Sequence, residues 1–97
     1  MKSTRECIEL LRKFKEQEAA AYGISRLCLF GSVARGEQVE GSDVDVCIEC
    51  PPMGLFKMGH LKYRLEQLFG CKVDLVRLRK QMNELLRGQI EKEGIYV

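Results

Sequence analysis

The spacing of apolar residues predicts three helices along this chain. In three stretches, apolar positions recur every three or four residues, which is the pattern of a helix that packs one face on a core. The predicted helices cover residues 4–22, 55–69 and 79–93. Ser3 and Glu6 have the spacing of a capping box at the start of the first helix, and Gly23 and Gly70 stand where the first two helices are expected to end.

Short apolar segments between these helices predict three strands. The segments cover residues 24–30, 43–50 and 71–78. In the second segment, β-branched residues alternate with Asp43, Asp45, Cys47 and Glu49. Because strand side chains alternate with a period of two, the apolar residues are expected on one face of the sheet and these four on the other.

The remaining segments complete an alternation of helices and strands. A helical turn over residues 33–35 and a polar loop over residues 36–42 connect the first two strands. In the last helix we expect four residues to face inward, namely Met82, Leu85, Leu86 and Ile90. Gly94 then ends this helix and leaves residues 95–97 as a tail. This order predicts an α/β (α+β) fold, with helices packed on a small sheet, as a single domain over residues 1–97.

The composition excludes several classes of protein. Hydrophobic residues make up 45% and charged residues 31% of the chain, and no apolar run is long enough to span a membrane. The net charge of +2 is too small to indicate stable nucleic-acid binding. The start of the chain is charged and lacks the apolar core of a signal peptide, so we expect a cytoplasmic protein.

The five cysteines are expected to be buried thiols. An odd number of cysteines without an export signal argues against a disulfide framework. Cys47 and Cys50 have the spacing of a metal-binding pair, but residues three apart on a strand face opposite sides of the sheet. Since His60 is the only histidine, a structural zinc site is not favoured.

Two short motifs predict a site for a metal ion and a nucleotide. Asp43 and Asp45 lie two apart on a predicted strand, so their carboxylates point to the same face and need a cation between them. Gly31 and Ser32 follow an apolar strand and open a helical turn. Free backbone N–H groups and a hydroxyl at such a place can bind a phosphate.

Asp74, in the middle of the last predicted strand, is a third candidate ligand. It joins Asp43 and Asp45 on one face if the second and third strands are neighbours. Two carboxylates about 4 Å apart repel by roughly 4 kcal/mol at an effective dielectric constant near 20. Mg²⁺ or Mn²⁺ removes that cost, and two such ions about 3.5–4 Å apart hold the attacking and leaving oxygens of nucleotidyl transfer. The alternative is a structural ion pair of Asp74 with Lys72 or Arg77.

The sequence does not match two other kinds of site, a P-loop and a catalytic serine. Residues 31–36 have the GxxxxG spacing of a P-loop, but Glu37 and Gln38 follow where that motif requires Lys and Ser or Thr. Ser32 has no general base for a role as nucleophile, because His60 lies in a helix remote in sequence and is expected to be solvated or capping.

Two groups of basic residues can each be interpreted in two ways. Arg35 either neutralises a triphosphate or pairs with Glu37 or a carboxylate of the sheet. The run formed by Arg77, Arg79 and Lys80 is either a solvated helix start or a surface that faces a phosphate or a partner.

The combined motifs resemble a known superfamily. Gly31 and Ser32, followed after ten residues by Asp43-x-Asp45 and later by Asp74, resemble the nucleotidyltransferases with the DNA polymerase β-type catalytic fold. More narrowly, Gly-Ser-x-Ala-Arg-Gly, Ser-Asp-x-Asp-Val, Val-Asp-Leu-Val and the ending Ile-Tyr-Val are similar to the minimal nucleotidyltransferases. These are the MntA-type antitoxins found beside HEPN-domain toxins. The resemblance covers nearly the whole chain and implies a polymerase β-type palm, a small mixed sheet with helices packed on it.

The resemblance also implies a role for each site residue. Gly31 and Ser32 would hold the β- and γ-phosphates of a nucleoside triphosphate, and Asp43 and Asp45 would bind the metal ions. Asp74 would complete the second metal site and orient the acceptor hydroxyl or act as its base. Larger members of the superfamily carry an extra helical domain for the acceptor. We therefore expect the acceptor surface to come from another polypeptide or from a second copy of this chain.

Three functions are compatible with these motifs. The leading one is metal-dependent transfer of AMP from ATP to a hydroxyl group of a partner protein, with a tyrosine of a cognate HEPN toxin as the expected acceptor. The second is a nucleotide-binding module without catalysis, which neutralises a helical toxin by stoichiometric binding through the last helix and the tail. The third is a nucleotidyltransferase for a small molecule or RNA that is assembled with a helical partner.

Overall fold

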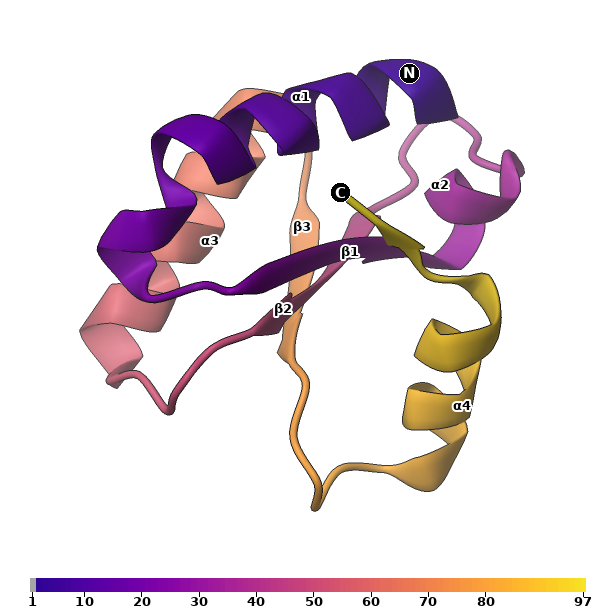
Figure 1. Cartoon of the computed structure of the whole chain (residues 1–97). Coiled ribbons are helices and arrows are strands. Elements are labelled where there is room, and N and C mark those ends of the chain that lie inside the picture. The colour runs from indigo at the N-terminus through magenta and orange to yellow at the C-terminus, as the bar shows by residue number, and fades with distance from the viewer. Residues whose placement is uncertain (1) are drawn as a thin grey trace.

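The computed structural model describes residues 2–97 and shows helices on both faces of a four-stranded sheet (Figure 1). The helices are α1 (Thr4–Gln17), the short 3-10 helix η1 (Ala19–Tyr22), α2 (Gly31–Arg35), α3 (Leu55–Phe69) and α4 (Glu84–Glu93). The strands are β1 (Arg26–Phe30), β2 (Val44–Glu49), β3 (Val73–Arg77) and β4 (Ile95–Tyr96). No helix in this part of the chain has the length and apolar character needed to cross a membrane.

The sheet has the strand order β3-β2-β1-β4 and is mixed, as expected. β1 runs antiparallel to both β2 and β4, whereas β2 and β3 are parallel. The parallel pair is joined by α3, the crossover helix that two parallel neighbours require. The neighbouring positions of β2 and β3 meet the condition under which Asp74 was expected to join the other carboxylates.

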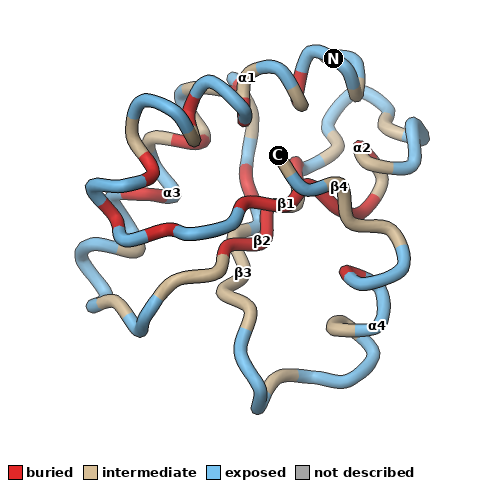
Figure 2. Tube along the Cα trace, in the orientation of Figure 1, coloured by how far each residue is buried: buried red, intermediate tan, exposed pale blue. Residues whose placement is uncertain are grey.

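The main core lies between the sheet and the two long helices. Figure 1 shows α1 and α3 on the same side of the sheet, and Figure 2 shows the buried residues gathered along the central strands. Leu27 and Leu29 of β1 face these helices together with Val44, Val46 and Ile48 of β2. The alternation in the sequence therefore predicted the correct apolar face.

A second, smaller core lies on the opposite face of the sheet, under α4. It consists of four buried residues, Cys28, Phe30, Cys47 and Ile90. Met82 and Leu86 pack partly buried against them, as predicted, but Leu85 is 86% exposed, so its prediction as an inward-facing residue was wrong. The sheet offers α4 only a narrow apolar strip here, because the same face also carries Asp45 and Asp74.

The boundaries of two helices differ from the prediction. α1 begins with the expected capping box between Ser3 and Glu6, but it ends at Gln17. The chain continues as the tighter η1 before Gly23, with φ of 72°, turns it toward β1. α4 begins at residue 84 rather than 79, because Asn83 accepts hydrogen bonds from the backbone N–H groups of residues 85 and 86 at 2.9 and 3.1 Å.

Residues 95–97, expected as a tail, instead extend the sheet. Ile95 lies opposite Leu29 and Tyr96 lies opposite Cys28 in an antiparallel pair with β1. Val97 adds a hydrogen bond from its N–H to the Leu27 carbonyl oxygen at 3.0 Å. This strand is too short to leave a periodic signal in the sequence. It forms because the edge of β1 is otherwise open.

Candidate active site

Strand pairing brings two of the predicted carboxylates together. Asp45 of β2 lies directly opposite Asp74 of β3, and Phe30 at the end of β1 lies opposite Asp45 on its other side. Both aspartates belong to the face of the sheet that α4 partly covers. Asp43 immediately precedes β2 and is exposed.

Gly31 brings the glycine–serine turn against this carboxylate pair. It follows β1 directly and has φ of 73°, a conformation that side chains disfavour. A Cβ atom on Gly31 would stand 2.1 Å from Oδ2 of Asp45, far inside van der Waals contact. The absence of a side chain therefore lets Asp45 lie against the start of α2, so the two predicted motifs meet in one place.

The electrostatics of Asp45 reflect this crowding. Burial, followed by the negative charges of Asp74 and Asp43, raises the pKa of Asp45 to about 6. A side-chain hydrogen bond with Asp74 acts in the same direction, while the positive charge of Arg35 lowers the pKa. A divalent cation would offset the repulsion between a partly buried carboxylate and two neighbouring ones.

The donor set therefore suits a hard divalent cation, which prefers carboxylate oxygens. Within residues 2–97, however, no three carboxylate, imidazole or thiol groups converge on one point. The geometry is a carboxylate pair, Asp45 and Asp74, with Asp43 nearby. In the same described residues, Asp74 forms no ion pair with Lys72 or Arg77, and Arg77 instead donates from Nη1 to the Cys50 carbonyl oxygen at 3.2 Å.

Arg35, at the end of α2, forms two ion pairs. Its Nε donates to Oε1 of Glu37 at 2.8 Å, which is one of the pairings expected from the sequence. Its Nη1 donates to Oε2 of Glu93 at 2.8 Å, a contact that sequence reasoning missed. Both hydrogen bonds raise the pKa of Arg35. The sequence offered one indirect hint of a role for Glu93: it stands at the end of a helix, where the helix dipole makes a negative charge unfavourable.

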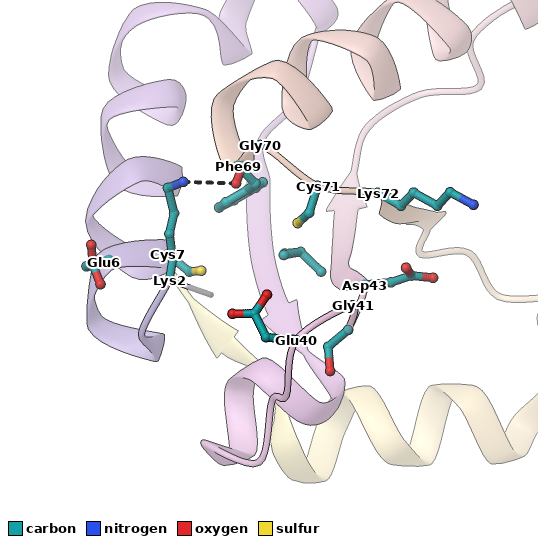
Figure 3. A pocket seen from close by; sticks show the side chains of 12 residues that line it. Lys2, Glu6, Cys7, Glu40, Gly41, Asp43, Phe69, Gly70, Cys71 and Lys72 are labelled. Carbon is teal, nitrogen blue, oxygen red and sulfur yellow. Dashed lines mark hydrogen bonds between the residues drawn. The ribbon is translucent and has the colours of Figure 1, made fainter.

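A cavity lies beside the pair formed by Asp45 and Asp74 and is lined in part by Asp43. It has a volume of about 700 Å³ and opens between the start of α1, the loop before β2 and the turn after α3. Figure 3 shows the thiols of Cys7 and Cys71 turned toward one another in this cavity, whereas the carboxylate of Asp43 points away from it. Lys2 closes one side by donating from Nζ to the Phe69 carbonyl oxygen at 3.0 Å.

The other residues singled out from the sequence have structural roles. All five cysteines are free thiols, and Cys7, Cys28 and Cys47 are buried. His60 shares a hydrogen bond of 2.7 Å with the hydroxyl of Tyr22 and stacks on its ring. The predicted helix start at residues 79–80 is instead part of the link between β3 and α4.

The fold and the site together define a nucleotidyltransferase. The family model for the nucleotidyltransferase domain matches residues 7–97, so this chain belongs to that family. The resemblance inferred from the motifs is thereby confirmed.

Known proteins support this assignment along the whole chain. A Methanocaldococcus jannaschii protein provisionally named a protein adenylyltransferase is 37% identical over 98 residues, which cover 100% of both chains. The solved structure of a provisionally named minimal nucleotidyltransferase matches with a TM-score of 0.77 and 34% identity, over 97% of this chain and 95% of that chain.

A third match concerns the fold alone. It is a chain from the solved complex of a tri-AMPylated Shewanella oneidensis HEPN toxin with MNT antitoxin. The TM-score is 0.60 and the identity 21%, over 96% of this chain and 66% of that chain.

Proposed function

We propose that this nucleotidyltransferase transfers AMP from ATP to a hydroxyl group of a partner protein and is the antitoxin of a helical, HEPN-type toxin. The observation that carries the proposal is the contact of Asp45 with both Asp74 and the glycine–serine turn at Gly31. The relative named as a protein adenylyltransferase supports the reaction. The fold neighbour solved with an AMPylated HEPN toxin supports the class of partner.

In this proposal, Gly31 and Ser32 bind the β- and γ-phosphates of ATP at the start of α2, and Arg35 contributes positive charge. The residues that would hold Mg²⁺ or Mn²⁺ are Asp43, Asp45 and Asp74. When bound, the cation would neutralise these carboxylates and withdraw charge from the α-phosphate. Asp74 is exposed whereas Asp45 is partly buried, so Asp74 is the carboxylate that an acceptor hydroxyl can approach from solvent.

The reaction is an in-line displacement. The acceptor oxygen forms a bond to the α-phosphorus while the bond between that phosphorus and the oxygen bridging to the β-phosphate breaks. The products are the AMP ester of the acceptor and pyrophosphate, and the hydroxyl proton passes to the carboxylate of Asp74 and then to water. The positive charge of Arg35 offsets the charge that develops on the leaving pyrophosphate.

Transfer of labelled AMP tests this function. The protein is mixed with MgCl₂, α-labelled ATP and the helical protein that co-purifies with it, and the products are separated on a denaturing gel. We expect label on the partner with the wild type and with the control Glu16→Gln, and no label with Asp45→Asn. Mass spectrometry of the labelled partner then tests whether the acceptor is tyrosine. Equal labelling by Asp45→Asn would contradict the proposed site.

A second candidate function is neutralisation by binding alone. The observation that favours it is Leu85, which is 86% exposed on α4 and offers an apolar contact to a partner. If this function is correct, no label is transferred and Asp45→Asn still neutralises the toxin in a tight complex. Label on RNA or a small molecule would instead support the third function, and label on this chain itself would indicate a second copy as acceptor.

A further inference from the structure

We infer that Glu93 is a positioning residue of the nucleotide site, which holds the guanidinium group of Arg35 where it binds the β- and γ-phosphates of ATP. This inference rests on the proposed function, because it requires a triphosphate bound at Gly31 and Ser32. It adds a residue of α4 to a site that the motifs place only on the sheet and α2.

The contacts of Arg35 orient its guanidinium group. Nε is bound to Glu37 and Nη1 is bound to Glu93, each at 2.8 Å. Nη2 has no hydrogen bond within the described residues, so this group remains available to an anion. A planar guanidinium held by two carboxylates has a fixed direction for its remaining N–H groups. Arg35 belongs to the same short helix as Gly31 and Ser32, and this helix packs against both β2 and α4.

Glu93 is the better anchored of the two carboxylates. Its side chain is 23% exposed against 55% for Glu37, and Gln89 also donates to its Oε2 at 3.4 Å. Glu37 belongs to the loop after α2, whereas Glu93 is the last residue of α4. A carboxylate at the C-terminal end of a helix opposes the helix dipole, so the stability of α4 does not explain a glutamate here.

The structure fixes the end of α4 against the sheet. Ile90 is fully buried, and a Cβ atom on Gly94 would stand 2.5 Å from both Sγ of Cys28 and the Ile90 carbonyl oxygen. The chain then pairs with β1 as β4. Glu93 is therefore attached to a rigid part of the molecule. Its hydrogen bond restricts the orientation of Arg35, which lies 58 residues away in sequence.

The test compares binding of two nucleotides by titration calorimetry in the presence of MgCl₂. α,β-Methylene-ATP carries the β- and γ-phosphates but cannot transfer AMP, and AMP lacks these phosphates. We expect Glu93→Gln to weaken binding of the ATP analogue about 3- to 10-fold, the effect of one weakened hydrogen bond, without changing the affinity for AMP. Glu91→Gln removes the same charge from the same helix without touching Arg35, so it should bind both nucleotides as the wild type does.

A double-mutant cycle with Arg35→Gln separates positioning from stability. If Glu93 acts through Arg35, then Glu93→Gln has no further effect on analogue binding in the Arg35→Gln background. Unchanged analogue affinity in Glu93→Gln, an equal loss for AMP, or an additive loss in the double variant would each overturn the inference. Failure of the proposed function is distinct: the wild type would then bind the analogue but transfer no label to a partner.

Discussion

Gly31 shows how a single missing side chain shapes the site. Both its φ of 73° and the 2.1 Å approach of Oδ2 of Asp45 to its Cβ position exclude other residues. We expect Gly31→Ala to displace Asp45, reduce AMP transfer at least about 10-fold, and lower the free energy of unfolding by about 1–3 kcal/mol. Labelling rates and thermal melts measure the two effects.

Gly41→Ala is the matched control for this substitution. Gly41 has φ of 87°, but nothing lies within 4 Å of its Cβ position. It therefore reproduces the backbone strain without the clash, and it should lower stability by about 1 kcal/mol while transfer continues. Equal losses of transfer in both variants would show that the contact between Gly31 and Asp45 does not matter.

Asp45 is expected to cost stability when no cation is bound. Its charge is partly buried and lies beside those of Asp74 and Asp43. Asp45→Asn keeps the shape of the side chain and removes the repulsion, so it should raise the melting temperature in EDTA by about 2–6 °C. After screening by solvent, this corresponds to a gain in the free energy of unfolding of somewhat under about 1 kcal/mol. The substitution removes a proposed metal ligand, so the melting temperature of the variant should no longer rise with MgCl₂.

Thermal melts with and without MgCl₂ test this expectation. Glu16→Gln removes an exposed charge of α1 and should behave as the wild type under both conditions. A rise of the melting temperature with MgCl₂ in Asp45→Asn as large as in the wild type would place the cation elsewhere.

At the scale of elements, two glycines of the last helical segment should respond in opposite directions. Gly88 lies within α4 with nothing near its Cβ position, so Gly88→Ala should stabilise the protein by about 0.5–1 kcal/mol through helix propensity. Gly94 ends the helix against Cys28, and a Cβ atom there would clash at 2.5 Å. Gly94→Ala should destabilise by about 1–3 kcal/mol, because the end of α4 must move away from β1.

Urea denaturation of both variants measures this contrast. If Gly94→Ala were as stable as the wild type, the end of α4 would not be fixed on the sheet. The inference about Glu93 would then lose its rigid support.

Sequence patterns located α3 correctly at both ends, because its apolar positions and the glycine that follows it are local signals. They misplaced the start of α4, because the prediction followed the apolar spacing alone. Asn83 is the one residue of a preferred N-cap type among residues 79–84, and it marks the observed start.

At the scale of the whole molecule, residues 95–97 hold distant parts of the chain together. Besides the pairing with β1, the carbonyl oxygen of Val97 accepts a hydrogen bond from Nζ of Lys15 at 2.7 Å, and Arg26 lies 4.1 Å from the ring centre of Tyr96. Ile95 and Val97 also pack against the main core. Deleting these residues should cost about 2–4 kcal/mol, a large part of the stability of a domain this size.

A thermal melt of the truncated chain tests this expectation. A complex lost on truncation would then reflect a damaged fold rather than a missing docking segment, so a partner surface must be tested by Leu85→Ser instead. An unchanged melting temperature would show that β4 adds little to the sheet and would restore the tail as a candidate for docking.

The sequence by itself determined the alternation of helices and strands, the apolar face of β2 and the types of residue available at the candidate site. These properties are local: periodicity follows from the geometry of one element, and the glycine–serine pair and Asp43-x-Asp45 are each short motifs that can be recognised without the rest of the chain. Asp74 was also singled out as a candidate, since a charge in the middle of a strand needs a partner, and its role in the site stays a prediction.

Only the tertiary structure decided which of these groups meet. The neighbouring positions of β2 and β3 place Asp74 beside Asp45, the open edge of β1 makes residues 95–97 a strand, and the docking of α4 brings Glu93 to Arg35. Each of these contacts joins elements far apart in sequence. No local pattern specifies them, because they depend on which edge or face the rest of the fold leaves available.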